Sequence, residues 1–356
     1  MSVVCKRPPV RVALAGLGRA MFADHYPVYK AHPALFDVVA ACDIVKERRD
    51  IVARDYPECR MFRQLEDMIY ERDIDLVDIA TRSADHCAHA LMSLRAGRWT
   101  LLETPLAVSA EEAQMLRGAS ARAKNRLIVL QRGLFAPDYL LAKSMMADAR
   151  LGGIHRIVVR REDFVRRDDW QTVKRLGGGA AYYAMTDLML QALKLMPVPP
   201  VQMWSELKRV ASLGDAEDYA HVNLRTRTQL SAEIVFDGGV LPGSRQPSFE
   251  LHGELGRFTV MPGETSGTLV AVAPGHRFPR RRSSVRTPSL ADMHEDIPVV
   301  CERVSLPPGT RHGPSAFWKC VYDAVRTAAA IPFSIDDSIE ALKFSNLMKK
   351  ASPFGK

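Results

Sequence analysis

The chain has 356 residues, of which 47% are hydrophobic and 25% charged, and its formal net charge is +8. This length predicts two domains, and the absence of an apolar run of about 18 residues predicts no membrane-spanning segment. Residues 1–9 contain no apolar segment typical of a secretory signal. The six cysteines are scattered without a C-x-x-C pair. This pattern argues against a zinc site and a disulfide scaffold, so we expect no bound metal and a cytoplasmic protein.

Much of the local excess of positive charge lies in residues 277–286, RFPRRRSSVR. A solvated loop or the rim of an oligomer is the favoured interpretation. A nucleic-acid site would need aromatic side chains on a defined fold, and Phe278 is the only one in this segment. We therefore expect no nucleic-acid partner.

The segment 12–21, VALAGLGRAM, is an apolar run followed by two glycines. The run predicts a buried parallel strand, and neither Gly16 nor Gly18 has a Cβ that would keep a phosphate from the backbone. A helix is expected from Arg19, with its N-terminal N–H groups directed at the same phosphate. Met21 stands where G-x-G-x-x-G has its third small residue, and its bulk should loosen helix packing or tilt the phosphate site.

A second apolar strand, residues 36–43, ends in Asp43, which follows Met21 by 22 residues. An acid at about this distance accepts hydrogen bonds from the adenosine ribose of a dinucleotide. Its carboxylate would repel a 2′-phosphate, so NAD is favoured over NADP. Lys46, Arg48 and Arg49 are close enough to weaken that preference.

Helices and strands then alternate up to residue 130. Helices are expected at 45–55, 65–71, 85–96 and 110–123, and strands at 59–62, 74–80, 99–102 and 127–130. The alternation predicts a doubly wound parallel sheet with ligands at the carboxyl ends of its strands. Those ends are residues 16–18, Asp43 and the segments 80–83, 103–105 and 131–133.

The pattern changes after residue 132. A long helix is expected at 136–150, then strands at 155–161, 201–209, 219–226, 230–236, 248–252 and 257–260, with a helix at 180–196 among them. A loop with one strand follows at 292–308, and helices at 315–329 and 338–349. Such strands in series predict an α+β domain with an antiparallel or mixed sheet. We expect two domains, 1–132 and 133–356. The acidic run 215–218 is typical of a solvated turn.

Several motifs together resemble one known family. They are ALAGLGR at 13–19, VVAACD at 38–43, DIATRSADH at 78–86, AGRWTLLETPL at 96–106, RLGGI at 150–154 and GGG at 177–179. With them the chain resembles, over nearly its whole length, the glucose–fructose oxidoreductase / inositol dehydrogenase / MocA (Gfo/Idh/MocA) family. The resemblance implies an N-terminal Rossmann domain and a C-terminal domain with a large open sheet. It also implies NAD(P)-dependent hydride transfer on a sugar, cyclitol or related polyol, and a homodimer or homotetramer formed through that sheet.

The resemblance also places site residues. It puts His86 near the cofactor ribose, and Thr81 is expected to contact the cofactor. Glu103 is expected to hydrogen-bond in the cofactor cleft and Trp170 to cover the nicotinamide side. Gly16, Gly18, Arg19 and Asp43 complete the expected cofactor contacts. The glycine triplet either forms a flexible turn on the substrate side or merely connects elements.

The chain departs from the family at the catalytic positions. The lysine of the family's Glu-Lys-Pro motif is Thr104, and the substrate-binding Asp and His are Tyr183 and Asp187. A slip of one residue would put Tyr182 at the Asp position. Thr104 carries no charge, so its help to a developing alkoxide is lost. Two hypotheses follow: a dehydrogenase in which Tyr183 and Asp187, with His86, form a replacement proton relay, or a catalytically degenerate relative that serves as a non-catalytic subunit or sensor.

Overall fold

The computed structural model describes residues 7–278 and 296–352. Most of the basic segment 277–286 lies outside these residues, so its interpretation stays a prediction. Within the described ranges, no helix combines the length and the apolar character needed to cross a membrane.

The first half contains a six-stranded sheet in which every neighbouring pair is parallel. The strand order is β3-β2-β1-β4-β5-β6. The strands are β1 (Val10–Ala15), β2 (Phe36–Cys42), β3 (Arg60–Phe62), β4 (Leu76–Ile79), β5 (Trp99–Leu102) and β6 (Leu127–Val129). The predicted doubly wound parallel sheet is therefore confirmed. The order reverses between β1 and β4, and open sheets of this kind bind ligands beyond the carboxyl ends of the strands at such a switch point.

The helices of this half are α1 (Tyr26–Ala31), α2 (Lys46–Asp55), α3 (Leu65–Met68), α4 (His86–Arg95) and α5 (Ala110–Arg122). A π-helical turn, η1 (Met21–His25), precedes α1. Met21 is fully buried in the same apolar cluster as Leu14 and Tyr29. The bulky residue thus enters the core, and the helix starts with a wider turn. Pro27 lies in the first turn of α1, where its missing N–H costs little.

The second half is built on an eight-stranded sheet of order β14-β13-β12-β11-β7-β10-β9-β8. Only β7 and β10 pair in parallel, and the other neighbours are antiparallel. The strands are β7 (Ile154–Glu162), β8 (Pro200–Lys208), β9 (Tyr219–Thr226), β10 (Ser231–Asp237), β11 (Phe249–Gly253), β12 (Gly256–Val260), β13 (Ser266–Val272) and β14 (Val299–Ser305). The predicted open, mainly antiparallel sheet is confirmed.

For the helices and strands of this half, two predictions were wrong and one strand was missed. The sequence did not predict β13. The long helix expected at 136–150 is α6 (Pro137–Met145), followed by a short 3₁₀ turn. The helix expected at 180–196 is divided at Ala184 into α7 (Ala180–Tyr183) and α8 (Met185–Leu195).

The acidic run 215–218 is not a solvated turn. Asp218 is fully buried, and its carboxylate accepts hydrogen bonds from three consecutive backbone N–H groups, those of residues 210–212. Glu217 is also buried and accepts from the N–H of Ala181 in the first turn of α7. Main-chain N–H groups take the place of water as hydrogen-bond donors to both carboxylates. The run therefore stabilises a turn inside the protein.

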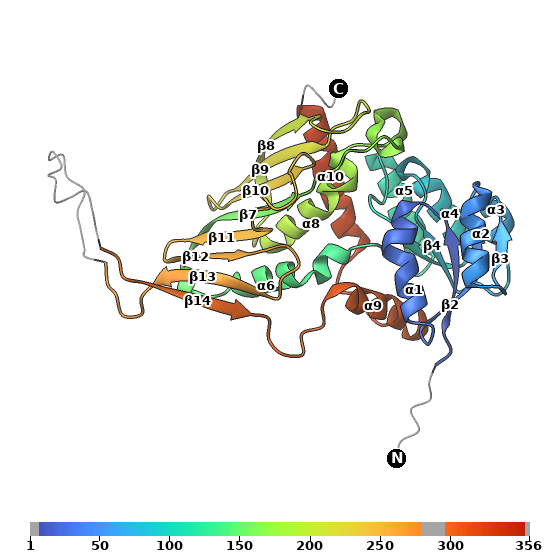
Figure 1. Ribbon diagram of the computed structural model, residues 1–356, viewed down its shortest axis with the longest axis horizontal. Helices are drawn as coiled ribbons and strands as arrows, with labels where there is room; N and C mark the ends of the chain where they lie inside the picture. Colours follow the sequence, from blue (N-terminus) through green and yellow to red (C-terminus); the bar gives the residue numbers. More distant parts are fainter. Residues whose placement is uncertain (1–6, 279–295, 353–356) are drawn as a thin grey trace, which may run out of the picture.

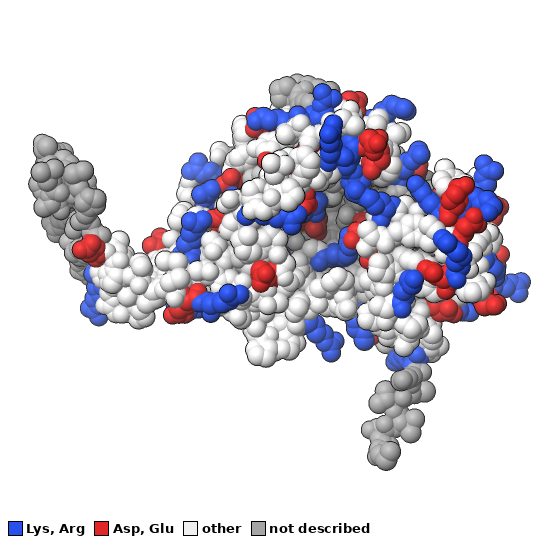
Figure 2. Space-filling model, in the orientation of Figure 1, with Lys and Arg blue, Asp and Glu red and all other residues white. Residues whose placement is uncertain are grey.

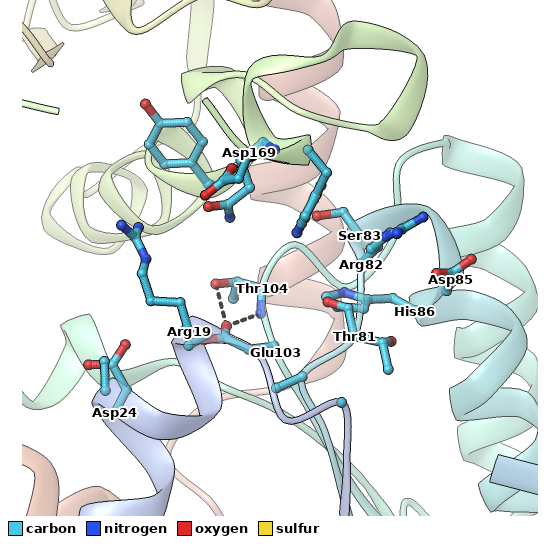
Figure 3. Close-up of a pocket in the computed structure, with 18 of the residues that line it drawn as sticks. Arg19, Asp24, Thr81, Arg82, Ser83, Asp85, His86, Glu103, Thr104 and Asp169 are labelled. Atoms are coloured by element: carbon cyan, nitrogen blue, oxygen red, sulfur yellow. Dashed lines mark hydrogen bonds between the residues drawn. The ribbon is translucent and has the colours of Figure 1, made fainter. Parts of the chain in front are cut away.

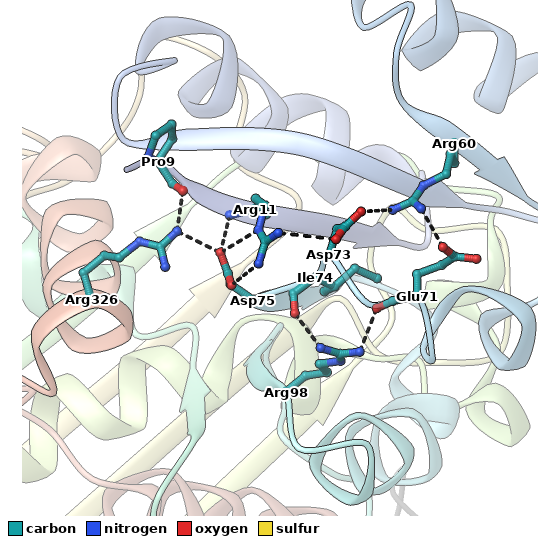
Figure 4. A network of polar contacts seen from close by, with 9 residues as sticks. All are labelled: Pro9, Arg11, Arg60, Glu71, Asp73, Ile74, Asp75, Arg98 and Arg326. Carbon is teal, nitrogen blue, oxygen red and sulfur yellow. Dashed lines mark hydrogen bonds and ion pairs between the residues drawn. The ribbon is translucent and has the colours of Figure 1, made fainter. Parts of the chain in front are cut away.

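The last two helices join the two sheets (Figure 1). α10 (Ile335–Ala351) contacts both α5 of the first half and α8 of the second. α9 (Gly313–Thr327) packs on the first sheet, where Trp318 is fully buried against Tyr29 and Phe36. At its end, Arg326 donates to Asp75, which also accepts from Arg11 (Figure 4).

Candidate functional site

The carboxyl ends of the first sheet open into a cavity of about 1120 Å³. Figure 2 shows the molecule hollowed between its two halves, with basic side chains gathered around the hollow. All the site residues predicted from the sequence line this one cavity. From the first half come Gly16, Gly18, Arg19, Asp43, Thr81, His86, Glu103 and Thr104, and from the second half Trp170, Tyr183 and Asp187.

The glycine turn after β1 has the backbone that a phosphate needs. Gly16 has a φ of +85°, and a Cβ there would lie 2.8 Å from the carbonyl oxygen of Ala80. At Gly18 an added Cβ would meet no atom within 4 Å, so this stretch of backbone borders open space. Because glycine at position 18 leaves the space over the turn open, the turn fits a pyrophosphate held by backbone N–H groups.

Asp43 fastens this turn to the end of β2. Its carboxylate accepts hydrogen bonds from the N–H of Leu17 (2.7 Å) and the N–H of Val45 (2.8 Å), and Arg48 lies 3.5 Å away. The residue is 7% exposed. The acid is thus fixed in position by main-chain donors at the edge of the cavity.

Thr104 and Glu103 lie at the end of β5, between Arg19 and Asp24 on one side and the Thr81–His86 turn on the other (Figure 3). Both the N–H and the hydroxyl of Thr104 donate to Oε2 of Glu103. The hydroxyl hydrogen of Thr104 is therefore already used in a hydrogen bond to the neighbouring carboxylate.

His86 holds the Thr81 turn against the segment after Thr104. Its Nδ1 lies 2.7 Å from the carbonyl oxygen of Pro105, and its Nε2 lies 3.2 Å from that of Thr81. Burial lowers the pKa of the ring despite these acceptors. Both ring nitrogens face main-chain oxygens rather than Tyr183 or Asp187. The geometry therefore favours a structural role for His86, in which it links these two segments, over a role in the predicted proton relay.

A buried charge network lies behind Glu103, and the sequence did not predict it. The ring of His25 is fully buried, with Nδ1 2.8 Å from Asp78 and Nε2 3.4 Å from Glu103. Burial opposes protonation of His25, but the two carboxylates outweigh it and raise its pKa to about 9. Burial likewise opposes ionisation of Glu103, yet His25 and then Arg132 lower its pKa to about 2. Glu103 is thus held as an anion by a cationic ring.

Arg132 brings a positive charge to the part of the cavity where Glu103 lies. It follows β6, and its guanidinium lies 3.0 Å from Asp24 and 3.9 Å from Glu103. Burial opposes its charge, but these carboxylates raise its pKa. The segment 131–133 was predicted as a ligand-side strand end, but nothing in the pattern distinguished this arginine.

Tyr183 ends α7 with its ring between Phe236 (centroids 5.5 Å apart) and the guanidinium of Arg167 (5.5 Å). Its hydroxyl is buried and has no hydrogen-bond partner among the described residues. Burial raises its pKa, so the phenol stays protonated at neutral pH. Tyr182 instead donates toward Val108 and Asn346, outside the cavity lining. The geometry therefore favours Tyr183 over its neighbour.

Asp187 lies four residues further on, in α8, and part of its surface is open to the cavity. Within the described ranges no hydrogen bond to its carboxylate is formed, and burial raises its pKa against the pull of Arg161 and Arg132. A Cβ on Gly133 would lie 2.5 Å from Oδ1 of Asp187. Only glycine at 133 lets the carboxylate lie this close to the backbone.

The glycine triplet 177–179 is packed. A Cβ on Gly178 would lie 2.5 Å from the carbonyl oxygen of Gln171, and Gly179 has a φ of +108° against the buried Glu217. These contacts hold the Trp170 segment beside the start of α7 and bring Trp170 to the cavity wall.

Comparison with known proteins agrees with this architecture. A protein-family model described as "Oxidoreductase family, NAD-binding Rossmann fold" matches residues 10–131. A second family model, described as "GFO/IDH/MocA C-terminal domain", matches residues 139–259. An uncharacterized oxidoreductase of Schizosaccharomyces pombe is 29% identical over 194 residues, 54% of this chain and 53% of that protein. The matched region thus spans about half the length of that relative.

Two further matches extend over most of the chain. The scyllo-inositol 2-dehydrogenase (NADP(+)) IolW of Bacillus subtilis is 21% identical over 347 residues, 96% of this chain and 94% of that protein. The solved structure of the WlbA dehydrogenase from Bordetella pertussis, in complex with NADH and UDP-GlcNAcA, superposes with a TM-score of 0.74. It shares 20% identity, with 96% of each chain covered. The chain belongs to the Gfo/Idh/MocA family of oxidoreductases, with an NAD-binding Rossmann domain at its N-terminus.

Proposed function

We propose that this protein is an NAD-dependent dehydrogenase that oxidises a secondary alcohol of a sugar, cyclitol or related polyol and reduces the corresponding carbonyl. One observation carries the proposal. A single cavity joins a glycine turn fit for a pyrophosphate to a carboxylate, Asp187, that no described residue engages in a hydrogen bond. Cofactor and proton-transfer group would thus meet in one space.

The chain's own residues would handle the proton. A bound nicotinamide would supply the hydride acceptor for the carbinol carbon. Asp187 would take the hydroxyl proton as the carbonyl forms and return it in the reverse reaction. Its raised pKa brings it closer to neutral pH, which suits a group that must both accept and donate. The hydroxyl of Tyr183 stays protonated and is buried in this structure, so it would donate a hydrogen bond to the same oxygen only after its side chain turns toward the cavity.

Arg132 supports this assignment because it supplies a cation that Thr104 cannot. Its guanidinium interacts with Glu103, next to Thr104, and with Asp187 through its charge. A fixed positive charge beside the reacting oxygen stabilises a developing alkoxide.

We propose NAD rather than NADP because of Asp43. A carboxylate held by two backbone N–H groups cannot swing away from a 2′-phosphate. Arg48 and Arg63 also line the cavity and would weaken the discrimination. IolW is named as NADP(+)-dependent, so the ratio of kcat/KM with the two cofactors is the direct test.

The experiment is to follow reduced cofactor with purified protein and a panel of sugars and cyclitols. Asp187→Asn should lower turnover by about 10²–10⁴-fold while NAD binding stays unchanged. Asp168→Asn, an exposed carboxylate in the loop before Trp170, is the matched control and should retain activity. A wild-type protein that binds NAD yet turns over no substrate would instead support the non-catalytic alternative.

We further propose a homodimer or homotetramer formed through the outer face of the eight-stranded sheet. α6 and α8 pack on the inner face, while Trp204, Val270 and Val299 are 53%, 40% and 59% exposed on the outer face. Trp204→Glu should shift the mass measured by light scattering to a smaller species. An unchanged mass, or a wild-type monomer, would exclude this interface.

A further inference from the structure

Arg161 contributes a guanidinium to the cavity lining and has no carboxylate partner among the residues that the structure describes. It lies near the end of β7, on the same face as the buried Ile157 and Val159, and β7 pairs it directly with Phe236 of β10. Its guanidinium lies 5.2 Å from the centroid of the Phe236 ring. Its Nε is buried with no hydrogen-bond partner, and none of its contacts within the described residues is an ion pair.

Two guanidiniums near Arg161 in the cavity are already engaged, while Arg19 and Arg166, which also line the cavity, are exposed to solvent. Arg132 is paired with Asp24 and approaches Glu103. Arg167 donates two hydrogen bonds to Asp169. These pairs neutralise their own charges, whereas the charge of Arg161 has no partner of this kind. Arg161 is partly exposed in the cavity lining, and within the described ranges it donates no hydrogen bond, so a ligand in the cavity is the acceptor that fits it.

The surroundings of Arg161 favour a carboxylate as that ligand. A guanidinium presents parallel N–H donors that match the two oxygens of a carboxylate. Asp187 is near enough that the charge of Arg161 opposes the rise in its pKa. A doubly charged phosphate would repel Asp187 more strongly than a singly charged carboxylate would.

We propose that the substrate is a hydroxy acid, a sugar or cyclitol whose carboxylate binds Arg161 while a hydroxyl group meets Tyr183 and Asp187. This inference rests on the proposed dehydrogenase function and names its substrate class. The bound carboxylate would also offset the pull of Arg161 on Asp187 and so favour the proton-accepting role of Asp187.

The test compares acids with matched neutral compounds: D-glucuronate with D-glucose, D-galacturonate with D-galactose, and quinate with myo-inositol. At least one acid should show a kcat/KM about 10–100-fold above that of its neutral partner, as a charge-assisted hydrogen bond allows. Arg161→Gln should abolish this preference and Arg161→Lys should retain part of it. The control is Arg227→Gln, at an exposed arginine in the hairpin between β9 and β10. It removes the same charge and should leave the preference for the acid unchanged.

Calorimetric binding of the same acids to the NADH-loaded protein, with melting temperatures of each variant, separates the possible outcomes. Turnover of neutral compounds without preference for the acid would overturn this inference and leave the dehydrogenase function standing. Acid binding that is lost in folded Arg161→Gln, without turnover of any compound, would support the site and overturn the proposed activity. Failure of every acid to bind would overturn the inference.

Discussion

Replacing His25 with glutamine should remove a pH-dependent part of the protein's stability. The ring is fully buried and lies between Asp78 at 2.8 Å and Glu103 at 3.4 Å. Glutamine keeps a polar group of similar size but cannot carry the positive charge that holds the two carboxylates.

The magnitude follows from the pKa of His25, which is raised from 6.5 to about 9. Each unit corresponds to about 1.4 kcal/mol, so the protonated ring stabilises the folded state by about 3 kcal/mol. The lowered pKa of Glu103 reflects the same contact in part and is not added. Because the folded pKa is raised, the contribution is complete below the unfolded value near 6.5 and is lost as the pH rises through 9.

The assay is urea-induced unfolding of wild type and His25→Gln at several values from about pH 6 to about pH 9.5, followed by circular dichroism. The wild type should be more stable by about 3 kcal/mol at the acidic end, and the difference should shrink across this range. His312→Gln, at an exposed histidine, is the matched control. Parallel stability profiles for wild type and His25→Gln would refute the charge assignment.

Three other substitutions probe separate parts of the structure. Gly133→Ala should lower turnover about 10²-fold with unchanged NAD affinity, because its Cβ would displace the amide of Gln191 and the carboxylate of Asp187, whereas Gly118→Ala in α5 should leave turnover intact. Asp43→Ala should weaken NAD binding about tenfold in a fluorescence titration, since both the glycine turn and the ribose lose an acceptor, and an unchanged affinity would contradict the ribose placement. Asp75→Asn should lower Tm at neutral pH. Burial opposes ionisation of Asp75, but hydrogen bonds from Arg11 and Arg326 outweigh it and lower its pKa, so the difference from wild type should fade as acid protonates the carboxylate.

The sequence was sufficient for the first sheet because apolar strands and helices alternate there with short connections. It was less informative in the second half, where local pattern competes with tertiary packing. β13 begins with Ser266 and Gly267, which are typical of a turn, yet Gly267 is required because a Cβ there would lie 2.4 Å from the Phe258 ring. Ala184 divides α7 from α8 although it is a good helix former.

The cavity followed from the sequence because parallel strands bring their carboxyl ends to one edge. The residues that the sequence missed depend on pairings that only the folded chain makes. His25 meets Asp78 across 53 residues, and Arg161 meets Phe236 through the register of β7 with β10. No local spacing relates the members of either pair, so neither could be recognised before the fold was known.

The departures at the positions predicted to be catalytic are easier to reconcile with the proposed enzyme than with the loss of activity. Where the family lysine is absent, Arg132 brings a cation to Glu103, and the adjacent Gly133 lets Asp187 approach. Tyr183 and Asp187 both line the cavity, and neither the phenol hydroxyl nor the carboxylate has a hydrogen-bond partner among the described residues. A buried polar group left unpaired, as the hydroxyl of Tyr183 is, costs about 1–3 kcal/mol, and a protein that only binds cofactor gains nothing from retaining it. A substrate oxygen that engages both groups would offset that cost, which favours a working active site.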